Sequence, residues 1–117
     1  MTESVNELVI SIMSGPDDGR VVRFRRGENE GEATAGGTWL ITLGRRDDCH
    51  LCLPFDTQIS RLHARLSFSH EHGWLLDDTG SRNGTFIEKR RIEGPYQLTA
   101  GQLFRIGRTW LRLEQVI

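Results

Sequence analysis

The apolar residues of this chain recur with a period of two, in short segments rich in leucine, β-branched and aromatic residues. Such alternation indicates half-buried β-strands, because successive side chains of a strand point to opposite faces. No segment keeps the spacing of an amphipathic helix through three turns. The segments that predict strands are 7–13, 20–24, 39–43, 64–68, 73–77, 85–87, 103–106 and 110–116.

Turn-forming residues separate the predicted strands. Gly, Pro, Asn or Asp returns about every ten residues, where the chain must reverse direction. Regular turn spacing without helices favours an all-β sandwich. The turn stretches are 14–19, 26–37, 69–73, 79–84, 93–96 and 99–102.

The segment 25–38 differs from its neighbours because it is rich in Gly and Glu and has no apolar anchor. This composition predicts a flexible hairpin loop. A length of 117 residues suits one domain with its own core. We therefore expect residues 1–117 to form a single domain.

The net charge of −1 provides no general field that would attract nucleic acid or an anionic membrane. The basic runs at 23–26 and 88–93 are bracketed by glutamates and favour a solvated surface. We expect neither nucleic acid nor membrane as a partner. The acidic start of the chain and its short first apolar run lead us to expect a cytoplasmic protein.

Two features of composition bear on candidate chemistry. Of the fifteen basic residues only Lys89 is not arginine, and the planar fork of arginine matches phosphate oxygens. A codon bias would explain this preference equally well. Cys49 and Cys52 form a C-x-x-C, but in an extended segment their thiols would point to opposite faces. We therefore predict no metal site and no cofactor.

Cationic and polar side chains gather in three predicted loops that flank strands. Arg45 follows one strand, Ser60 and Arg61 lie in the next long loop, and Arg82 and Asn83 lie in a third. A phosphate on a protein carries about −1.5 to −2 charges and needs several converging donors. Loops at one end of a sandwich can converge in this way. Each arginine alone is also compatible with a solvated charge, but together they predict a phosphate cradle.

The same stretches carry a family resemblance. "GR" at 44–45, "SRLHA" at 60–64 and "DTGSRNGTF" at 78–86 resemble, in this order, the motifs of the forkhead-associated (FHA) domain, and 98–107 is similar to its closing strands. The resemblance implies an eleven-stranded β-sandwich of two twisted sheets with its ligand loops at one end. It also implies a non-catalytic module that binds phosphothreonine peptides.

The resemblance assigns roles to individual positions. It implies phosphate binding by Arg45 and Ser60, with Arg61 assisting. Arg82 joins the predicted phosphate-binding residues because of its place in the third loop. It implies contacts to the peptide by Asn83 and, for the residue three places after the phosphothreonine, by Gln58. The remaining matched positions, which would support the loops, are Gly44, His63, Gly84 and Thr85.

Two departures from the family motifs alter local expectations. Where Asn-Gly usually follows "GTF", this chain has Glu88 and Lys89 after Ile87, which predicts a hairpin that is longer or differently turned. Gln102 stands where the family usually has Asp, which puts a capping interaction in doubt.

The predicted partner is a phosphothreonine-bearing protein, with a Ser/Thr kinase or its substrate as candidates, and the role is that of an adaptor in Ser/Thr kinase signalling. An alternative keeps the fold but binds an unphosphorylated protein through a sheet face. A hydrolase triad of Ser60, His63 and Asp77 or Asp78 has no G-x-S-x-G turn to support it. We therefore expect that the protein is not an enzyme.

Overall fold

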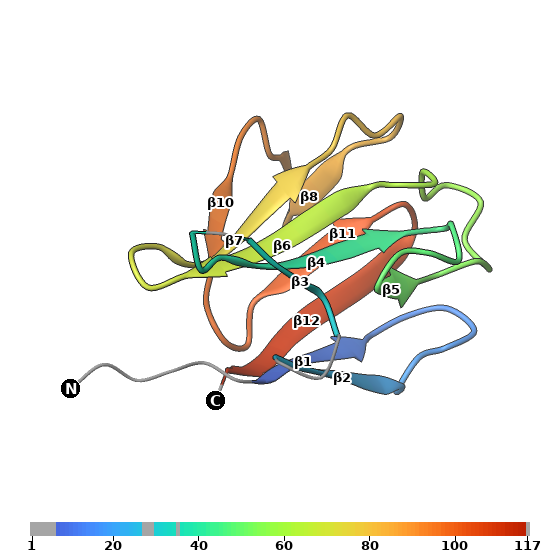
Figure 1. The fold of residues 1–117 in the computed structure, drawn as a ribbon. Coiled ribbons are helices and arrows are strands. Elements are labelled where there is room, and N and C mark those ends of the chain that lie inside the picture. Colours follow the sequence, from blue (N-terminus) through green and yellow to red (C-terminus); the bar gives the residue numbers. More distant parts are fainter. Residues whose placement is uncertain (1–6, 27–29, 35, 117) are drawn as a thin grey trace.

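The computed structural model describes residues 7–26, 30–34 and 36–116. It is a sandwich of two β-sheets (Figure 1), so the predicted fold class is confirmed. Its strands are β1 (Glu7–Ile12), β2 (Val21–Arg25), β3 (Glu32–Ala33), β4 (Trp39–Gly44), β5 (Leu51–Cys52), β6 (Ala64–Ser69), β7 (Gly73–Asp78), β8 (Thr85–Ile87), β9 (Arg90–Arg91), β10 (Tyr96–Leu98), β11 (Leu103–Ile106) and β12 (Thr109–Val116).

The two sheets are assembled from strands that are mostly neighbours in sequence. The first sheet has the order β2-β1-β12-β11-β8-β9, and all its pairs are antiparallel. The second has the order β10-β7-β6-β4-β3, with β5 joined to β4 as a parallel pair. Within the described ranges, no helix has the length and apolarity that a membrane crossing requires.

Twelve strands are present in the described residues, against the eleven that the family resemblance implies. Strands β3, β5, β9 and β10 are two or three residues long, too short for an alternating pattern to reveal them. The segment 25–38, predicted as a flexible loop, contains β3, whose residues pair with Leu40 and Trp39. Residues 27–29 and 35 of that segment lie outside the described residues.

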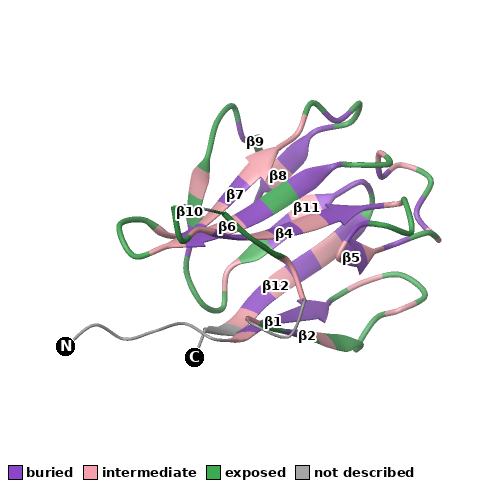
Figure 2. Ribbon diagram, in the orientation of Figure 1, coloured by how far each residue is buried: buried purple, intermediate pink, exposed green. Residues whose placement is uncertain are grey.

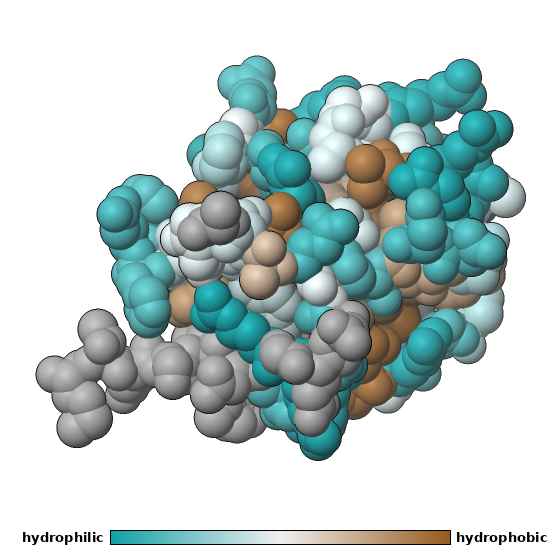
Figure 3. All heavy atoms as spheres, viewed as in Figure 1, coloured by the Kyte–Doolittle hydropathy of each residue, from teal (hydrophilic) through white to brown (hydrophobic). Residues whose placement is uncertain are grey.

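The core lies between the sheets and is built by the inward-facing half of each strand. In β6, Ala64, Leu66 and Phe68 are buried and alternate with more exposed residues, as Figure 2 shows. Fully burying one leucine or isoleucine side chain contributes about 1.5–3 kcal/mol relative to leaving it exposed. Hydrophilic residues cover most of the face seen in Figure 3. The largest fully buried side chains are Trp39, Phe104, Leu8, Ile10, Ile12, Ile41, Leu43, Leu51, Leu53, Ile59, Leu66 and Leu76.

The two departures from the family motifs have defined local structures. Ile87 pairs with Arg90, so the β8–β9 turn has only two residues. Of the two alternatives expected here, a longer or a differently turned hairpin, the longer one is wrong. Glu88 adopts a φ of 55°, a left-handed conformation that Asn and Gly adopt more readily. At the other position Gln102 still closes a turn, because its Oε1 accepts from the Thr99 amide at 3.1 Å.

Loops from both sheets emerge at one end of the sandwich, on the right in Figure 1. They include the segments 45–50 and 53–63 on either side of β5, the segment 79–84 between β7 and β8, and the turn at 107–108 between β11 and β12. Each is anchored by strands of the packed core. Rigid strands therefore fix the loops that carry the candidate site.

Candidate functional site

The six predicted ligand-contacting residues line one open pocket of about 320 Å³ at this end of the sandwich. We call it the tip pocket. Thr57 and Ile59 complete its lining. The side chains come from three segments that are far apart in sequence, as the loop pattern predicts. The six residues are Arg45, Gln58, Ser60, Arg61, Arg82 and Asn83.

Arg45 is held in position by the loop on the opposite side of the pocket. Its Nε donates to the Ile59 carbonyl at 2.9 Å, and its backbone amide donates to the Ser60 carbonyl at 3.1 Å. The side chain is half-buried. Since Nε is engaged, the two terminal nitrogens of the fork remain available for an anion.

Ser60 connects the loop 53–63, which we call the second loop, with the loop 79–84, which we call the third. Its Oγ accepts a hydrogen bond from the Arg82 amide at 3.1 Å. The side chains of Arg61 and Arg82 are exposed and, within residues 7–26, 30–34 and 36–116, have no hydrogen-bond or ion-pair partner. The pocket therefore combines a hydroxyl with guanidinium groups whose charge no other residue in the described ranges neutralises.

Asn83 and Gln58 meet at the rim of the pocket. The Nδ2 of Asn83 donates to the Gln58 carbonyl at 2.8 Å and to its Oε1 at 3.1 Å. The side chain of Asn83 is exposed. This pair fixes the amide of Asn83 across the gap between the second and third loops, with its oxygen free to accept.

Gly44 is required for the close approach of two loops. A Cβ at this position would overlap the Arg61 carbonyl oxygen and come within 2.8 Å of the Cys49 Sγ. Gly44 is the last residue of β4 and pairs with Cys52 in β5. Gly44 is one of the positions expected to support the loops, and the structure gives a specific reason: a side chain here would occupy the space of the loop that carries Arg61.

Gly44→Ala is expected to destabilise the fold by about 1–3 kcal/mol, because the added methyl meets backbone rather than a flexible side chain. Chemical denaturation measures the loss. Gly94→Ala is the control, since a Cβ there meets nothing within 4 Å. Equal stabilities of the two variants would contradict the close-approach role.

His63 is completely buried and joins the second loop to the third. Its Nδ1 accepts from the Ser60 amide at 3.0 Å, so the ring proton resides on Nε2, which donates to the Gly84 carbonyl at 2.8 Å. Burial lowers the pKa of His63, and the Gly84 carbonyl and the carboxylates of Asp78 and Asp56 only partly oppose this. The ring is therefore neutral at neutral pH.

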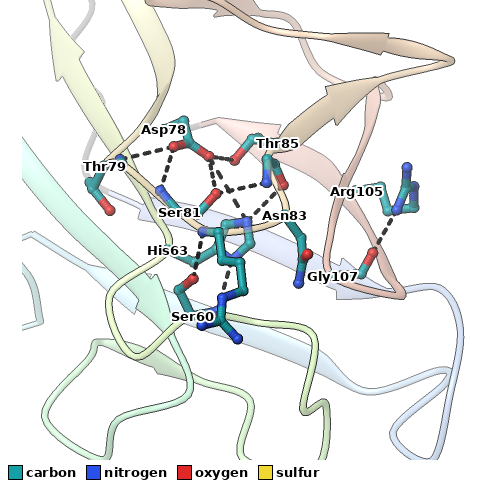
Figure 4. A network of polar contacts seen from close by, with 12 residues as sticks. Ser60, His63, Asp78, Thr79, Ser81, Asn83, Thr85, Arg105 and Gly107 are labelled. Atoms are coloured by element: carbon teal, nitrogen blue, oxygen red, sulfur yellow. Dashed lines mark hydrogen bonds and ion pairs between the residues drawn. The ribbon is translucent and has the colours of Figure 1, made fainter.

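Asp78 organises the third loop from within, as Figure 4 shows. Its Oδ2 accepts from the hydroxyls of Ser81 at 2.6 Å and Thr85 at 2.7 Å, and its Oδ1 accepts from the amides of Gly80 and Ser81. Burial alone would raise the pKa of this carboxyl, but these hydrogen bonds outweigh it and hold the pKa below its usual range. Thr85 therefore supports the loop through Asp78.

Gly84 lies at the end of this loop with a φ of 88°, which favours glycine. Its amide donates to the Ser81 Oγ at 2.9 Å, while its carbonyl accepts from His63. Gly84 therefore joins the Asp78 network to His63 and holds the neighbouring Asn83 at the pocket.

Asp56 supports the site and was not singled out from the sequence. Its Oδ1 accepts from the Gln58 amide, and its Oδ2 accepts from the Arg108 amide and the Thr109 hydroxyl. Gly107 must lack a side chain there, since a Cβ would lie 2.7 Å from Ile59 and 2.9 Å from the Asp56 carboxylate. The second loop is thus tied to the closing turn of β11 and β12.

The residues considered for a hydrolase triad are engaged differently. The hydroxyl of Ser60 accepts from the Arg82 amide, whereas His63 contacts the backbone amide of Ser60. Asp78 lies 4.0 Å from the His63 Nε2.

The thiols of Cys49 and Cys52 approach different carbonyls, those of Arg61 and Arg45.

Comparisons with known proteins follow the same motifs. The FHA domain family profile matches residues 41–107, more than half of the chain. FHA domain-containing protein FhaB of Mycobacterium tuberculosis (strain ATCC 25618 / H37Rv) is 36% identical over 74 residues, 63% of this chain and 46% of FhaB. The human Angiogenic factor with G patch and FHA domains 1 is 33% identical over 78 residues, 60% of this chain and 11% of that protein. The chain thus spans less than half the length of these curated relatives.

Solved FHA domains share the fold. One from a structural and functional analysis of phosphothreonine-dependent FHA domain interactions has a TM-score of 0.70 and 26% identity, over 93% of this chain and 96% of that one. The FhaA FHA domain, solved in complex with the intracellular domain of another protein, has a TM-score of 0.69 and 26% identity, over 92% and 99%. An FHA domain from Arabidopsis thaliana has a TM-score of 0.76 at 22% identity, over 100% and 94%, and shows the shared fold alone.

Proposed function

The chain belongs to the FHA domain family, and from this premise we propose that its tip pocket binds a phosphothreonine-containing segment of a partner protein. FHA domains are binding modules. Arg45, Ser60, Arg61 and Arg82 would hold the phosphate, and Asn83 and Gln58 would contact the peptide. The observation that carries the proposal is the convergence of these side chains on one open pocket with unneutralised guanidinium groups.

The chemistry of the pocket suits a phosphate dianion on a peptide. Charge-assisted hydrogen bonds from guanidinium groups and a hydroxyl satisfy its oxygens. The exposed amide of Asn83 can bond an extended peptide backbone, since its oxygen is free to accept an N–H. An uncharged partner would leave several cations of the pocket without a counter-charge.

The expected affinity is micromolar. Each charge-assisted hydrogen bond contributes roughly 1.5–3 kcal/mol, so three or four of them contribute about 4.5–12 kcal/mol before the entropy of ordering a peptide is subtracted, and a micromolar Kd, which corresponds to about 8 kcal/mol, lies within this range. Titration of one threonine peptide in phosphorylated and unphosphorylated form, followed by calorimetry, tests the proposal. We expect binding of the phosphorylated form and no detectable binding of the other. Equal affinity for both would overturn the proposal in favour of a partner recognised through a sheet face.

The same reasoning extends to the biological role. A pocket specific for phosphothreonine makes the chain an adaptor that reads the product of a Ser/Thr kinase, with the kinase or its substrate as the partner. The solved FhaA FHA domain, in complex with the intracellular domain of another protein, is an example of partner binding within the family.

A further inference from the structure

A row of arginine and aromatic side chains crosses the outer face of the first sheet. Arg91 in β9 pairs with Phe86 in β8, Phe86 pairs with Arg105 in β11, and Arg105 pairs with Trp110 in β12. Directly opposite residues share a face of the sheet, so the four side chains form one line. The Arg105 guanidinium lies 4.3 Å from the centre of the Phe86 ring and 5.9 Å from that of Trp110. We call this line the arginine–aromatic row.

The row begins beside the tip pocket. A Cβ placed on Gly84 would lie 2.6 Å from the Nε of Arg91 and 3.0 Å from its Cδ and Cζ, so the Arg91 side chain lies across Gly84. Gly84 directly follows Asn83, which lines the pocket. A chain that leaves the pocket over Asn83 therefore reaches Arg91 first.

The positive charge of the row is not neutralised within the described part of the chain. Arg91 is exposed and has no hydrogen-bond or ion-pair partner there, and the Arg105 guanidinium donates a hydrogen bond to the Gly107 carbonyl at 2.6 Å, a neutral acceptor. Arg112, on the next outward position of β12, is instead paired with Glu114 at 2.8 Å. The unneutralised charge thus continues from Arg61 and Arg82 onto the row.

We propose that the arginine–aromatic row, led by Arg91, binds an acidic stretch that flanks the phosphothreonine in the same partner chain. This inference rests on the proposed function and adds a preference to it. The row crosses four strands spaced about 4.8 Å apart, roughly 14 Å in all, the length of about four extended residues. Carboxylates would meet the guanidinium groups, while the Phe86 and Trp110 rings accommodate apolar parts of the same segment.

Three phosphothreonine peptides that differ only in the four residues on each side of the phosphothreonine test the preference. These residues are aspartate and glutamate in the first peptide, neutral residues in the second and lysines in the third. We expect the wild type to bind the acidic peptide about 3- to 10-fold more tightly than the neutral one. The Arg91→Glu variant should no longer bind the acidic peptide more tightly than the neutral one. It should instead bind the lysine peptide more tightly than the neutral one. The neutral peptide should bind both proteins within about 2-fold.

Arg90→Glu is the matched control, because it changes the net charge equally one residue away. Arg90 pairs with Ile87, whose side chain is buried on the other face, and lines a different pocket. It should keep the preference for the acidic peptide. Equal loss of preference in both variants would assign the effect to the general field and overturn the inference.

Other outcomes separate the row from the tip pocket. Equal wild-type affinity for the acidic and neutral phosphopeptides would overturn the role of the row and leave phosphothreonine binding intact. Failure of the wild type to bind any phosphorylated peptide would overturn the proposed function, and the inference with it. A wild-type dimer that dissociates in Arg91→Glu would assign the row to a second copy of the chain and contradict the inference.

Discussion

Replacing Arg45 by alanine is expected to weaken binding of a phosphothreonine peptide by about 2–4 kcal/mol, roughly 30- to 1000-fold in Kd. The Nε of Arg45 is already bonded to the Ile59 carbonyl, so the fork is oriented before the ligand arrives. A preoriented cation loses little conformational entropy on binding. Without it the phosphate would lie in the pocket with its main counter-charge absent. Isothermal calorimetry at a fixed salt concentration measures the change.

The neighbouring Arg46 provides the control for this prediction. Arg46 is exposed and pairs with Asp48, and it is not among the residues that line the tip pocket. Arg46→Ala should bind the peptide within about 2-fold of the wild type. Both variants should unfold close to the wild type, since Arg45→Ala removes one side-chain hydrogen bond worth about 1 kcal/mol. Wild-type affinity in Arg45→Ala would contradict the assignment of the pocket.

The sandwich could be predicted from sequence because its strands carry local signals. Alternating burial in β4 and β6 is a property of consecutive residues, and it is visible before any long-range contact is known. Strands β5 and β9 have two residues each, and partners elsewhere in the chain, rather than their own sequence, make them strands.

The candidate site was predictable in part, for a similar reason. Arg45, Ser60 and Asn83 could be singled out because polar residues in loops beside strands, at the motif positions, point to recognition. The contact of Asp56 with the Arg108 amide joins residues 52 positions apart. No periodicity or motif in the sequence predicts this contact. The space required at Gly44 likewise depends on where a distant carbonyl lies.

Arg91 illustrates a further limit of sequence analysis. Within the run 88–93 it looks like one of several solvated cations. Its significance depends on the register of the β8–β9 hairpin, which puts Arg91 opposite Phe86 and turns Arg90 to the other side. A shift of one residue would exchange the two, because side chains alternate along a strand.

His63→Ala is expected to lower the free energy of unfolding by about 3–5 kcal/mol and to weaken peptide binding as well. The ring is completely buried, and its removal leaves the Ser60 amide and the Gly84 carbonyl without partners. Each buried unpaired group costs about 1–3 kcal/mol, and the cavity adds to this cost. Chemical denaturation measures the stability, and His70→Ala, at an exposed histidine, is the control.

The dependence of stability on pH distinguishes the loss of this ring from a nonspecific loss of packing. The folded protein holds the pKa of His63 below its ordinary value of about 6.5. As the pH falls below that value, this histidine therefore takes up a proton in the unfolded chain but stays neutral in the folded one. Wild-type stability should therefore fall between pH 7.5 and 5, with a slope of at most about 1.4 kcal/mol per pH unit from this residue. His63→Ala should lose that part of the slope, and His70→Ala should keep it. Asp78, whose pKa is also lowered, contributes to the pH dependence only below about pH 5, at the lower edge of this window, and does so equally in the wild type and both variants. Unchanged affinity and an unchanged melting curve in His63→Ala would show that the second and third loops are held together by something other than this ring.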